Sequence, residues 1–312
     1  MKYGIMSGAL WGLDTVILSI ALVMIPFLGS SEAALSSALL HDLACALILL
    51  VYMGVRGRLR DTIAAVKTHS GKAVMGAAVL GGPIGMSGYL IAINNIGPGY
   101  TAIISTFYPA VGTLLAFLFL KERMHPRQII ALLGALGGVI LMGWSSMTAE
   151  IPGNAAIGIG AALLCVIGWG SEAVILAWGM RNEAVDNETA LQIRETTSAL
   201  VYLLVVGPIF GVVGFSLKAM PTPAAGILLI AAIAGTASYL YYYKAIDTIG
   251  ASRGMALNIS YAAWAVIFGL ILLQAVPSPL VIFCCVVILV GTVLAASPNW
   301  SELNFKKITA GK

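Results

Sequence analysis

Residues 11–18 read Trp11-Gly12-Leu13-Asp14-Thr15-Val16-Ile17-Leu18, and residues 169–176 read Trp169-Gly170-Ser171-Glu172-Ala173-Val174-Ile175-Leu176. Six of the eight paired positions are identical or exchange one carboxylate for the other. Each copy places an acidic side chain inside an apolar run. The copies are 158 residues apart in a chain of 312 residues. The stretch therefore predicts that the whole chain is a duplication.

The composition is that of an integral membrane protein. Hydrophobic residues make up 60% of the chain and charged residues 10%, whereas a soluble domain carries about 25% charged residues. Apolar runs of about 20 residues, the length that crosses a bilayer as a helix, recur throughout. The first run ends without a small-residue cleavage pattern, so we expect a spanning helix there and not a signal peptide.

The apolar runs predict an all-α integral membrane protein with ten transmembrane helices. Short loops join the runs and leave no room for a soluble domain. An even number of spans places both termini on the same side of the membrane. The predicted spans are 3–27, 32–54, 73–94, 100–120, 127–145, 156–179, 190–214, 224–245, 254–274 and 279–297.

Lysines and arginines predict the orientation, because cytoplasmic loops are enriched in them. With the N-terminus in the cytoplasm, 16 of the 17 basic residues fall on the cytoplasmic side and only Lys218 falls outside. The opposite orientation would invert that count. We therefore expect both termini, including the polar tail from Pro298 onward, in the cytoplasm.

Further residue pairs extend the duplication at an offset of 153 residues. They predict two halves, 1–150 and 151–312, with five spans each and a short C-terminal tail on the second. Because five is odd, the second half enters the membrane from the opposite side. Such inverted repeats are typical of secondary transporters, which bind substrate near the midplane between the halves. The pairs are Tyr89 with Tyr242, Tyr108 with Tyr261, Gly138 with Gly291, and His41-Asp42 with Arg194-Glu195.

The run from Gly97 to Pro109 reads Gly-x-x-Tyr-Thr-Ala-x-x-Ser-Thr-x-Tyr-Pro. With the Trp-Gly pair in each half and the Lys121-Glu122-Arg123 turn, it resembles the EamA-type branch of the drug/metabolite transporter superfamily. The resemblance covers nearly the whole chain. It implies a multi-pass protein of the bacterial inner membrane that exports small metabolites, often amino acids. Within that branch, the chain is most similar to the bacterial aromatic amino-acid exporters.

Two features depart from the pattern of that family. The second half has Gln274-Ala275 where the first has Lys121-Glu122, so the turn has no charged counterpart. His41-Asp42 stands where relatives often carry an arginine.

The two carboxylates of the repeated stretch lie inside predicted spans. Asp14 lies about 11 residues into its helix, roughly 16 Å along the axis and so near the midplane, and Glu172 lies nearer the cytoplasm. A charge at the bilayer centre costs about 2.5–3.5 kcal/mol on insertion scales, so each acid should line a cavity or be paired. We expect them to contact a substrate amine or take up a proton; the alternative is a structural hydrogen bond between helices.

Two basic–acidic dipeptides also fall within spans. His41 and Asp42 point about 100° apart on one helix, so they cannot face the same spot. Histidine titrates near neutral pH and could relay a proton, although a hydrogen-bonded packing role is the alternative. Arg194 and Glu195 lie nearer the cytoplasmic surface, where we expect the arginine to snorkel and to pair locally.

Aromatic side chains within the spans suggest a cavity wall. Rings suit an apolar or aromatic substrate by stacking, and an ammonium group by cation–π attraction; ordinary helix packing is the alternative. Proline marks the candidate hinges, because it frees backbone groups in a helix. The predicted substrate-binding residues are Trp11, Asp14, His41, Tyr89, Tyr108, Trp169, Glu172, Tyr242, Asn258, Tyr261 and Trp264, and the predicted hinges are Pro83, Pro109 and Pro208.

The sequence favours a secondary transporter that exports neutral amino acids, aromatic ones above all, by alternating access, with a proton as the candidate coupling ion. Export of amphipathic or cationic drugs is the alternative, and a membrane enzyme or lipid-handling scaffold is a remote third. Catalytic motifs, metal-ligand spacing and cofactor-binding motifs are missing, so we expect no enzyme, no metal, no cofactor and no nucleic-acid partner. The scarcity of basic residues within the spans argues against phosphorylated cargo.

Overall fold

The computed structural model describes residues 1–145, 153–181 and 185–300, and within these ranges the chain is helical, without strands. The helices of the first half are α1 Lys2–Leu22, α2 Ala33–Val55, α3 Leu59–Ala65, α4 His69–Val79, η1 Leu80–Met86, α5 Ser87–Ser105, α6 Tyr108–Leu115, η2 Ala116–Leu120 and α7 Pro126–Ser145. Those of the second half are α8 Ala155–Gly179, α9 Asn187–Val201, η3 Tyr202–Val206, α10 Gly207–Ile209, α11 Val213–Ala219, α12 Pro223–Ile249, α13 Ala251–Asn258, α14 Tyr261–Leu273 and α15 Pro279–Ala296. The segments labelled η are π-helical.

In the described ranges, eight helices are long and apolar enough to cross a bilayer, and a ninth is added if one bent pair counts as a span. The sequence predicted ten. The predicted span 100–120 is interrupted: it begins within α5, breaks before Tyr108, and leaves an apolar helix too short to be counted by itself. The predicted span 190–214 bends by 117° between Ile209 and Val213. Ten crossings therefore remain a prediction.

The three prolines expected to act as hinges all lie at irregular points of helices. Pro83 lies inside the π-helical segment η1. Pro109 lies in the first turn of α6, directly after the break at residues 106–107. Pro208 lies in α10, next to the π-helical segment η3. A proline cannot donate a backbone hydrogen bond, and π-helical turns accommodate such interruptions. Their movement as hinges remains a prediction.

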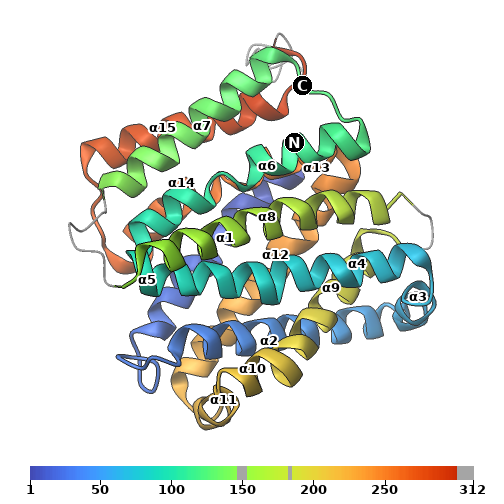
Figure 1. The fold of residues 1–312 in the computed structure, drawn as a ribbon, viewed down its shortest axis with the longest axis vertical. Coiled ribbons are helices and arrows are strands. Elements are labelled where there is room, and N and C mark those ends of the chain that lie inside the picture. The colour runs from blue at the N-terminus through green and yellow to red at the C-terminus, as the bar shows by residue number, and fades with distance from the viewer. Residues whose placement is uncertain (146–152, 182–184, 301–312) are drawn as a thin grey trace, which may run out of the picture.

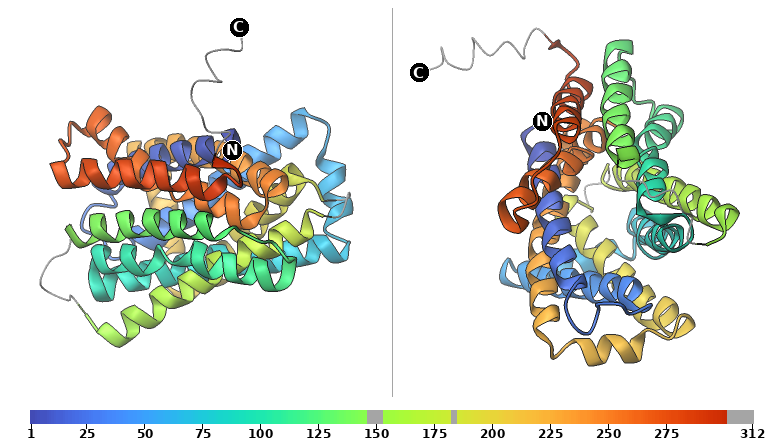
Figure 2. Two further views of the ribbon diagram at one scale, coloured as in Figure 1. Left: turned by 90° about the horizontal axis from the view of Figure 1, so that it is seen from above. Right: turned by 90° about the vertical axis from the view of Figure 1, so that its left-hand side faces the viewer.

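The two halves of the chain interlock. α1, from the first half, packs against α12 and α14 of the second, and α5 packs against α8. Each half ends in a long helix, α7 in the first and α15 in the second, and these two helices pack together at one edge of the bundle (Figure 1). Figure 2 shows the same bundle from two further sides, with the helices running side by side. Residues that are distant in sequence therefore meet between the halves.

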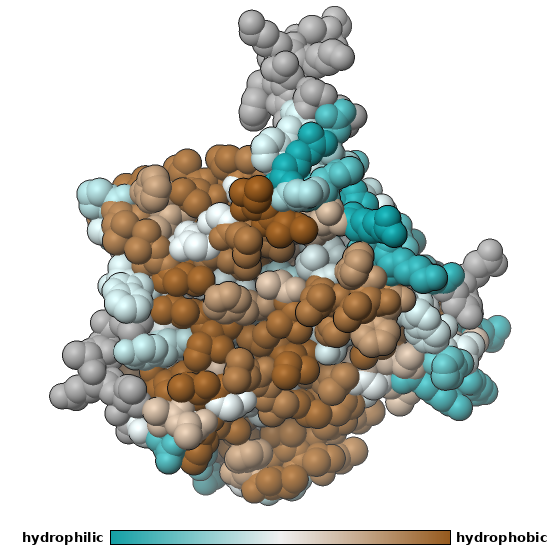
Figure 3. All heavy atoms as spheres, turned by 45° about the horizontal axis from the view of Figure 1, so that its top comes forward, coloured by the Kyte–Doolittle hydropathy of each residue, from teal (hydrophilic) through white to brown (hydrophobic). Residues whose placement is uncertain are grey.

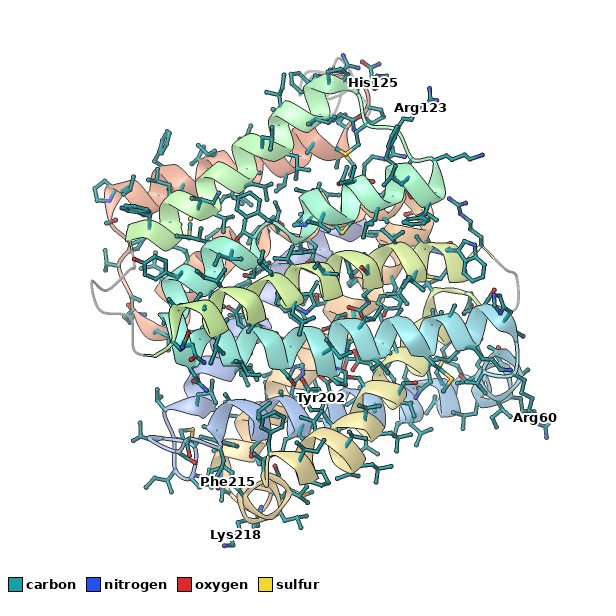
Figure 4. All side chains as sticks on the ribbon, viewed as in Figure 1. Arg60, Arg123, His125, Tyr202, Phe215 and Lys218 are labelled. Carbon is teal, nitrogen blue, oxygen red and sulfur yellow. The ribbon has the colours of Figure 1, made fainter. Side chains whose placement is uncertain are left out.

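The surface fits a protein surrounded by lipid. Large apolar side chains are exposed along many helices, and Figure 3 shows hydrophobic residues over most of one face with hydrophilic ones gathered along an edge. Arg60, Arg123 and His125 lie toward one end of the helices, whereas Lys218 lies apart from them near α11 (Figure 4). Together with the apolar helices, this is the surface of a multi-pass membrane protein.

Candidate functional site

A pocket of about 70 Å³ lies in the interior between the two halves, with room for several water molecules. Its walls come from helices of both halves, so a rearrangement between the halves would change its shape. The residues that line it are Trp11, Met86, Tyr108, Trp169, Glu172, Ala173, Arg194, Ser238, Tyr239, Tyr242, Asn258 and Tyr261.

Six of the twelve residues that line the pocket are aromatic. Trp11 of α1 meets Tyr239 of α12 edge to face, with ring centroids 4.9 Å apart. Trp169 of α8 meets Tyr108 of α6 in the same manner at 5.7 Å. The Trp169 indole nitrogen also donates a hydrogen bond of 3.0 Å to the Gly81 carbonyl in η1. The rings are therefore held in fixed orientations by contacts across the two halves.

A chain of hydrogen bonds forms the polar side of the pocket. The Tyr108 hydroxyl donates to Asn258 Oδ1 at 3.0 Å, and Asn258 Nδ2 donates to Ser7 Oγ at 2.9 Å. Ser238 Oγ in turn donates to the Ser7 carbonyl at 2.9 Å. These bonds join four helices, α6, α13, α1 and α12, at the level of the pocket.

Arg194 of α9 is the basic side chain in the pocket lining, and acidic groups surround it. Its Nε donates to Glu172 Oε1 at 2.9 Å, and a terminal nitrogen donates to Glu195 Oε1 at 2.8 Å. Asp42 Oδ2 lies 3.9 Å away. The guanidinium also lies over the Tyr239 ring, 4.8 Å from its centroid. The positive charge is thus already neutralised by the protein.

This arrangement corrects one interpretation of the sequence. Arg194 was expected to snorkel to the cytoplasmic surface, yet it is only 4% exposed. The expected snorkelling was wrong, because three carboxylates from three helices meet the guanidinium in the interior, whereas the expected local pairing is present as the bond to Glu195. Such pairing makes burial of a charge tolerable, and local sequence does not reveal it.

A second acid–base pair lies in the first half, outside the pocket lining. His41 Nε2 of α2 and Asp14 Oδ1 of α1 are 3.1 Å apart, and both side chains are buried. His41 Nδ1 lies 3.8 Å from Asp42 Oδ1. The other oxygen of Asp42 accepts a hydrogen bond of 2.5 Å from Ser198 of α9. Asp42 therefore stands between this pair and Arg194.

Glycines allow the charged groups to approach neighbouring helices. A Cβ at Gly81 would collide with the Glu172 carboxylate, and one at Gly82 would collide with Ser198 Oγ. In α12, a Cβ at Gly235 would lie 3.0 Å from the His41 ring. Gly82 and Gly235 are 153 residues apart, the offset of the duplication. This shared offset is the sequence signal that could have identified Gly82 and Gly235 as equivalent positions next to the charged groups.

The structure distributes the predicted site residues over four places. Tyr89 lies behind the pocket wall, against Trp169, with ring centroids 5.4 Å apart. Asp14 and His41 form the second pair described above. Trp264 packs against Phe268, and its indole nitrogen has no hydrogen-bond partner among the described residues. The remaining seven line the pocket: Trp11, Tyr108, Trp169, Glu172, Tyr242, Asn258 and Tyr261. Their roles in substrate binding remain predictions.

Five lining residues were not among the predicted site residues. Arg194 and Tyr239 carried a signal, because one is a charge and the other an aromatic ring within a predicted span. Met86, Ala173 and Ser238 carried none, since small or apolar residues and serines are ordinary inside a membrane helix. Their positions follow from packing between helices that are far apart in sequence.

Comparison with known proteins agrees with the fold. The model of the EamA-like transporter family matches residues 2–144 and again residues 156–297, which supports an architecture of two repeats. The chain is 30% identical over 226 residues to Protein LicB of Haemophilus influenzae, covering 70% of this chain and 73% of LicB. A crystal structure of a protein with 17% sequence identity superimposes with a TM-score of 0.69, covering 100% of this chain and 98% of the other.

Proposed function

Because the chain belongs to the EamA-like transporter family, it is a membrane transporter of small molecules, and we propose that its substrates are small organic cations. The pocket between the halves is the proposed binding site. The trimethylammonium group is the chemistry that suits it best, because aromatic walls bind a diffuse positive charge that cannot donate hydrogen bonds.

The observation that carries this proposal is the balance of charge around the pocket. Six aromatic rings and the Glu172 carboxylate face it, whereas the guanidinium of Arg194 is already held by acidic partners. Three carboxylates, Glu172, Glu195 and Asp42, share this single guanidinium, so acidic groups remain in excess beside the aromatic rings, and this arrangement attracts a cation. A substrate carboxylate would have to displace an acid from Arg194.

Neutral aromatic amino acids, the substrates expected from the sequence, are the second candidate. Their rings would stack on Trp11 or Trp169, and their amino group would face Glu172. Binding would also require Arg194 to exchange Glu172 or Glu195 for the substrate carboxylate. Since that exchange leaves a buried acid without its partner, we rank this class below the organic cations.

Transport is proposed to follow alternating access of the two repeats around the pocket, with export as the proposed direction. Ten crossings, the repeat boundary near residue 150, cytoplasmic termini and the bacterial inner membrane are parts of the same proposal. The irregular points at Pro83, Pro109 and Pro208 are the proposed sites of bending. They support it because each proline lies within or next to a break or a π-helical segment between stretches of α-helix.

The test is binding and transport by the purified full-length protein. Choline and tetramethylammonium should raise its thermal unfolding temperature, since ligands of the folded state stabilise it by mass action. Radiolabelled choline should show saturable counterflow in proteoliposomes, and empty liposomes are the control. Counterflow of phenylalanine or tryptophan without counterflow of choline would instead establish the second candidate. Diluting choline on one side of the membrane at a time, and recording which dilution starts the flux of choline, reports the direction of transport.

A further inference from the structure

A groove of about 620 Å³ lies on the outside of the bundle, between α6–η2 and α7, and shares no residue with the pocket between the halves. α7 packs against α15 and α5, and the groove occupies the space on its α6 side. Leu114 and Phe117 form one wall and Leu133 the other, and each of these side chains is more than half exposed. A hollowed, exposed apolar surface of this kind is typical of a binding site for an apolar ligand.

A short non-helical segment, residues 121–125, joins η2 to α7 beside the groove, and residues 122–124 contribute to its lining. The chain turns sharply as it leaves η2, because Lys121 has a left-handed backbone with φ of 58°. Exposure then alternates along the segment: Lys121, Arg123 and His125 are exposed, whereas Glu122 and Met124 are partly buried. The segment therefore presents its basic side chains outward and its acid inward.

The acid of this segment is already engaged by the protein. Glu122 accepts three hydrogen bonds from Ala251 and Ser252 at the start of α13, where a helix N-terminus favours negative charge. Neither Lys121 nor Arg123 has an ion-pair partner among the residues that the structure describes. Two positive charges therefore stand beside an apolar groove without an anion from the described part of the protein.

The duplication shows that the turn itself does not require these charges. At the offset of 153 residues, Lys121 corresponds to Gln274 and Arg123 to Val276. Gln274 keeps the left-handed backbone, with φ of 55°, so the second half retains the turn without the basic side chains. The positive charge of the first half is thus free to serve a ligand.

We propose that this groove binds an anionic phospholipid of the adjacent leaflet, with an acyl chain between α6 and α7 and its phosphate on Arg123. The guanidinium fork matches phosphate oxygens in a bidentate manner, and the ammonium of Lys121 adds a compact charge beside it. The lipid tethers residues 121–125 and thereby stabilises the Glu122 cap on α13. This site is separate from the one proposed for the transported substrate.

The experiment measures lipid binding by the delipidated full-length protein in detergent, using native mass spectrometry and thermal unfolding. Long-chain phosphatidylglycerol should bind about tenfold more tightly than phosphatidylethanolamine with the same chains, and it should raise the unfolding temperature more. Glycerophosphoglycerol, the same headgroup without acyl chains, should not compete. Equal binding of the two lipids, or full competition by the chain-free headgroup, would overturn the proposal.

A charge variant tests the basic side chains. Combining Lys121→Gln with Arg123→Gln should weaken phosphatidylglycerol binding about thirtyfold, a factor of about fivefold for each basic side chain, and leave the unfolding temperature without lipid unchanged. Arg60→Gln is the matched control, because it removes an exposed arginine on α3, at the same end of the molecule (Figure 4). Unchanged affinity in the double variant, or an equal loss in Arg60→Gln, would overturn the assignment of the headgroup to this groove.

A variant within the wall tests the place of the acyl chain. Leu133→Gln makes the groove polar and should weaken phosphatidylglycerol binding severalfold. Leu141→Gln changes another exposed leucine of α7, about two turns further along the helix and outside the groove, and should bind as the wild type does. Equal binding by the two leucine variants would overturn the assignment of the acyl chain to this groove.

Discussion

Glu122 and Ser252 lie on opposite halves of the chain and are joined by a hydrogen bond of 2.9 Å from Ser252 Oγ to Glu122 Oε2. The same carboxylate accepts the backbone N–H groups of Ala251 and Ser252, each at 3.0 Å. A loop of the first half thus caps the N-terminus of α13 in the second. The equivalent of Glu122 in the duplication is Ala275, so this bond has no counterpart at the other end of the molecule.

Replacing the capping carboxylate should therefore destabilise the protein. Glu122→Ala removes three hydrogen bonds and the favourable interaction of a negative charge with a helix N-terminus, a loss of about 0.5–2 kcal/mol. The measurement is the thermal unfolding temperature in detergent. Arg123→Gln, at the exposed neighbouring position, should leave that temperature unchanged. Equal unfolding temperatures for the Glu122 variant and the wild type would contradict the role of the cap.

Trp169 should contribute to cation binding through its ring. Trp169→Ala removes a wall of the pocket, and a lost cation–π contact of about 0.5–2 kcal/mol corresponds to about 2- to 30-fold weaker binding. Trp169→Phe keeps a ring and should lose less. Titration with choline measures both. Trp144→Ala, which removes an exposed tryptophan of α7, is the matched control and should bind as the wild type does; a similar loss there would argue against the pocket.

Arg194 should be required for folding as well as for the site. Arg194→Gln leaves buried carboxylates without their partner and should cost about 3–5 kcal/mol. Adding Glu195→Gln removes one of those uncompensated charges, so the double variant should be more stable than the single one. Yield of monodisperse protein and the unfolding temperature measure the effect. If the two variants were equally unstable, the cluster would not be held by charge balance.

Gly81 should be needed for the position of Glu172. A methyl group at Gly81 would occupy the place of the carboxylate, and since that carboxylate ends a flexible side chain, it should move away from Arg194. We expect Gly81→Ala to lower transport about tenfold, equivalent to about 1.4 kcal/mol. Gly76→Ala, on α4 with open space around it, should raise helix stability by up to about 1 kcal/mol and leave transport unchanged. Equal transport by both variants would contradict the prediction.

Asp186, at the start of α9, should make stability depend on pH. Burial disfavours its charged form, but hydrogen bonds from Thr189 and Arg58 outweigh burial and hold the pKa of this carboxyl below its ordinary value. The ionised form therefore stabilises the folded state above the unfolded-state pKa of about 3.9. That stabilisation is lost as the pH falls through the lower pKa of the folded state.

Arg58→Gln tests this relationship. At pH 7 the variant should unfold at a lower temperature than the wild type, because Arg58 bonds to Asp186 at 2.7 Å and also pairs with Glu188. The difference should shrink as the pH is lowered toward 3, where the acids become protonated. Arg60→Gln, an exposed neighbour, is the control. A difference that stays constant with pH would show that charge pairing is not its source.

Much of the membrane architecture was predictable because it depends on local composition. Eight of the ten apolar runs correspond to helices long enough to cross a bilayer, and the repeated Trp-Gly-x-acid stretch indicated the two repeats, which the family comparison confirms. The two broken spans were harder to predict. The break before Tyr108 and the bend between Ile209 and Val213 both lie inside runs that were predicted as single spans, because hydropathy continues across them.

The sequence predicted the types of residue in the candidate site better than it predicted which side chains contact one another. Periodic aromatic residues and buried acids marked Trp11, Trp169 and Glu172, and all three line the pocket. Asp14 and Glu172 find their partners on other helices. The sequence predicted a surface position with local pairing for Arg194. Its neighbour Glu195 is one of the three carboxylates around it, and the other two come from α8 and α2.

The sequence by itself determined that this chain is a duplicated membrane protein with acids and rings inside its helices, because hydropathy and repetition are properties of the order of residues. Only the tertiary structure decided that Glu172 pairs with Arg194, that Asp14 pairs with His41, and that Asp42 connects the two pairs. The physical reason is that a buried charge is stabilised by whatever group packing brings within a few ångströms, and packing joins helices that are far apart in the chain.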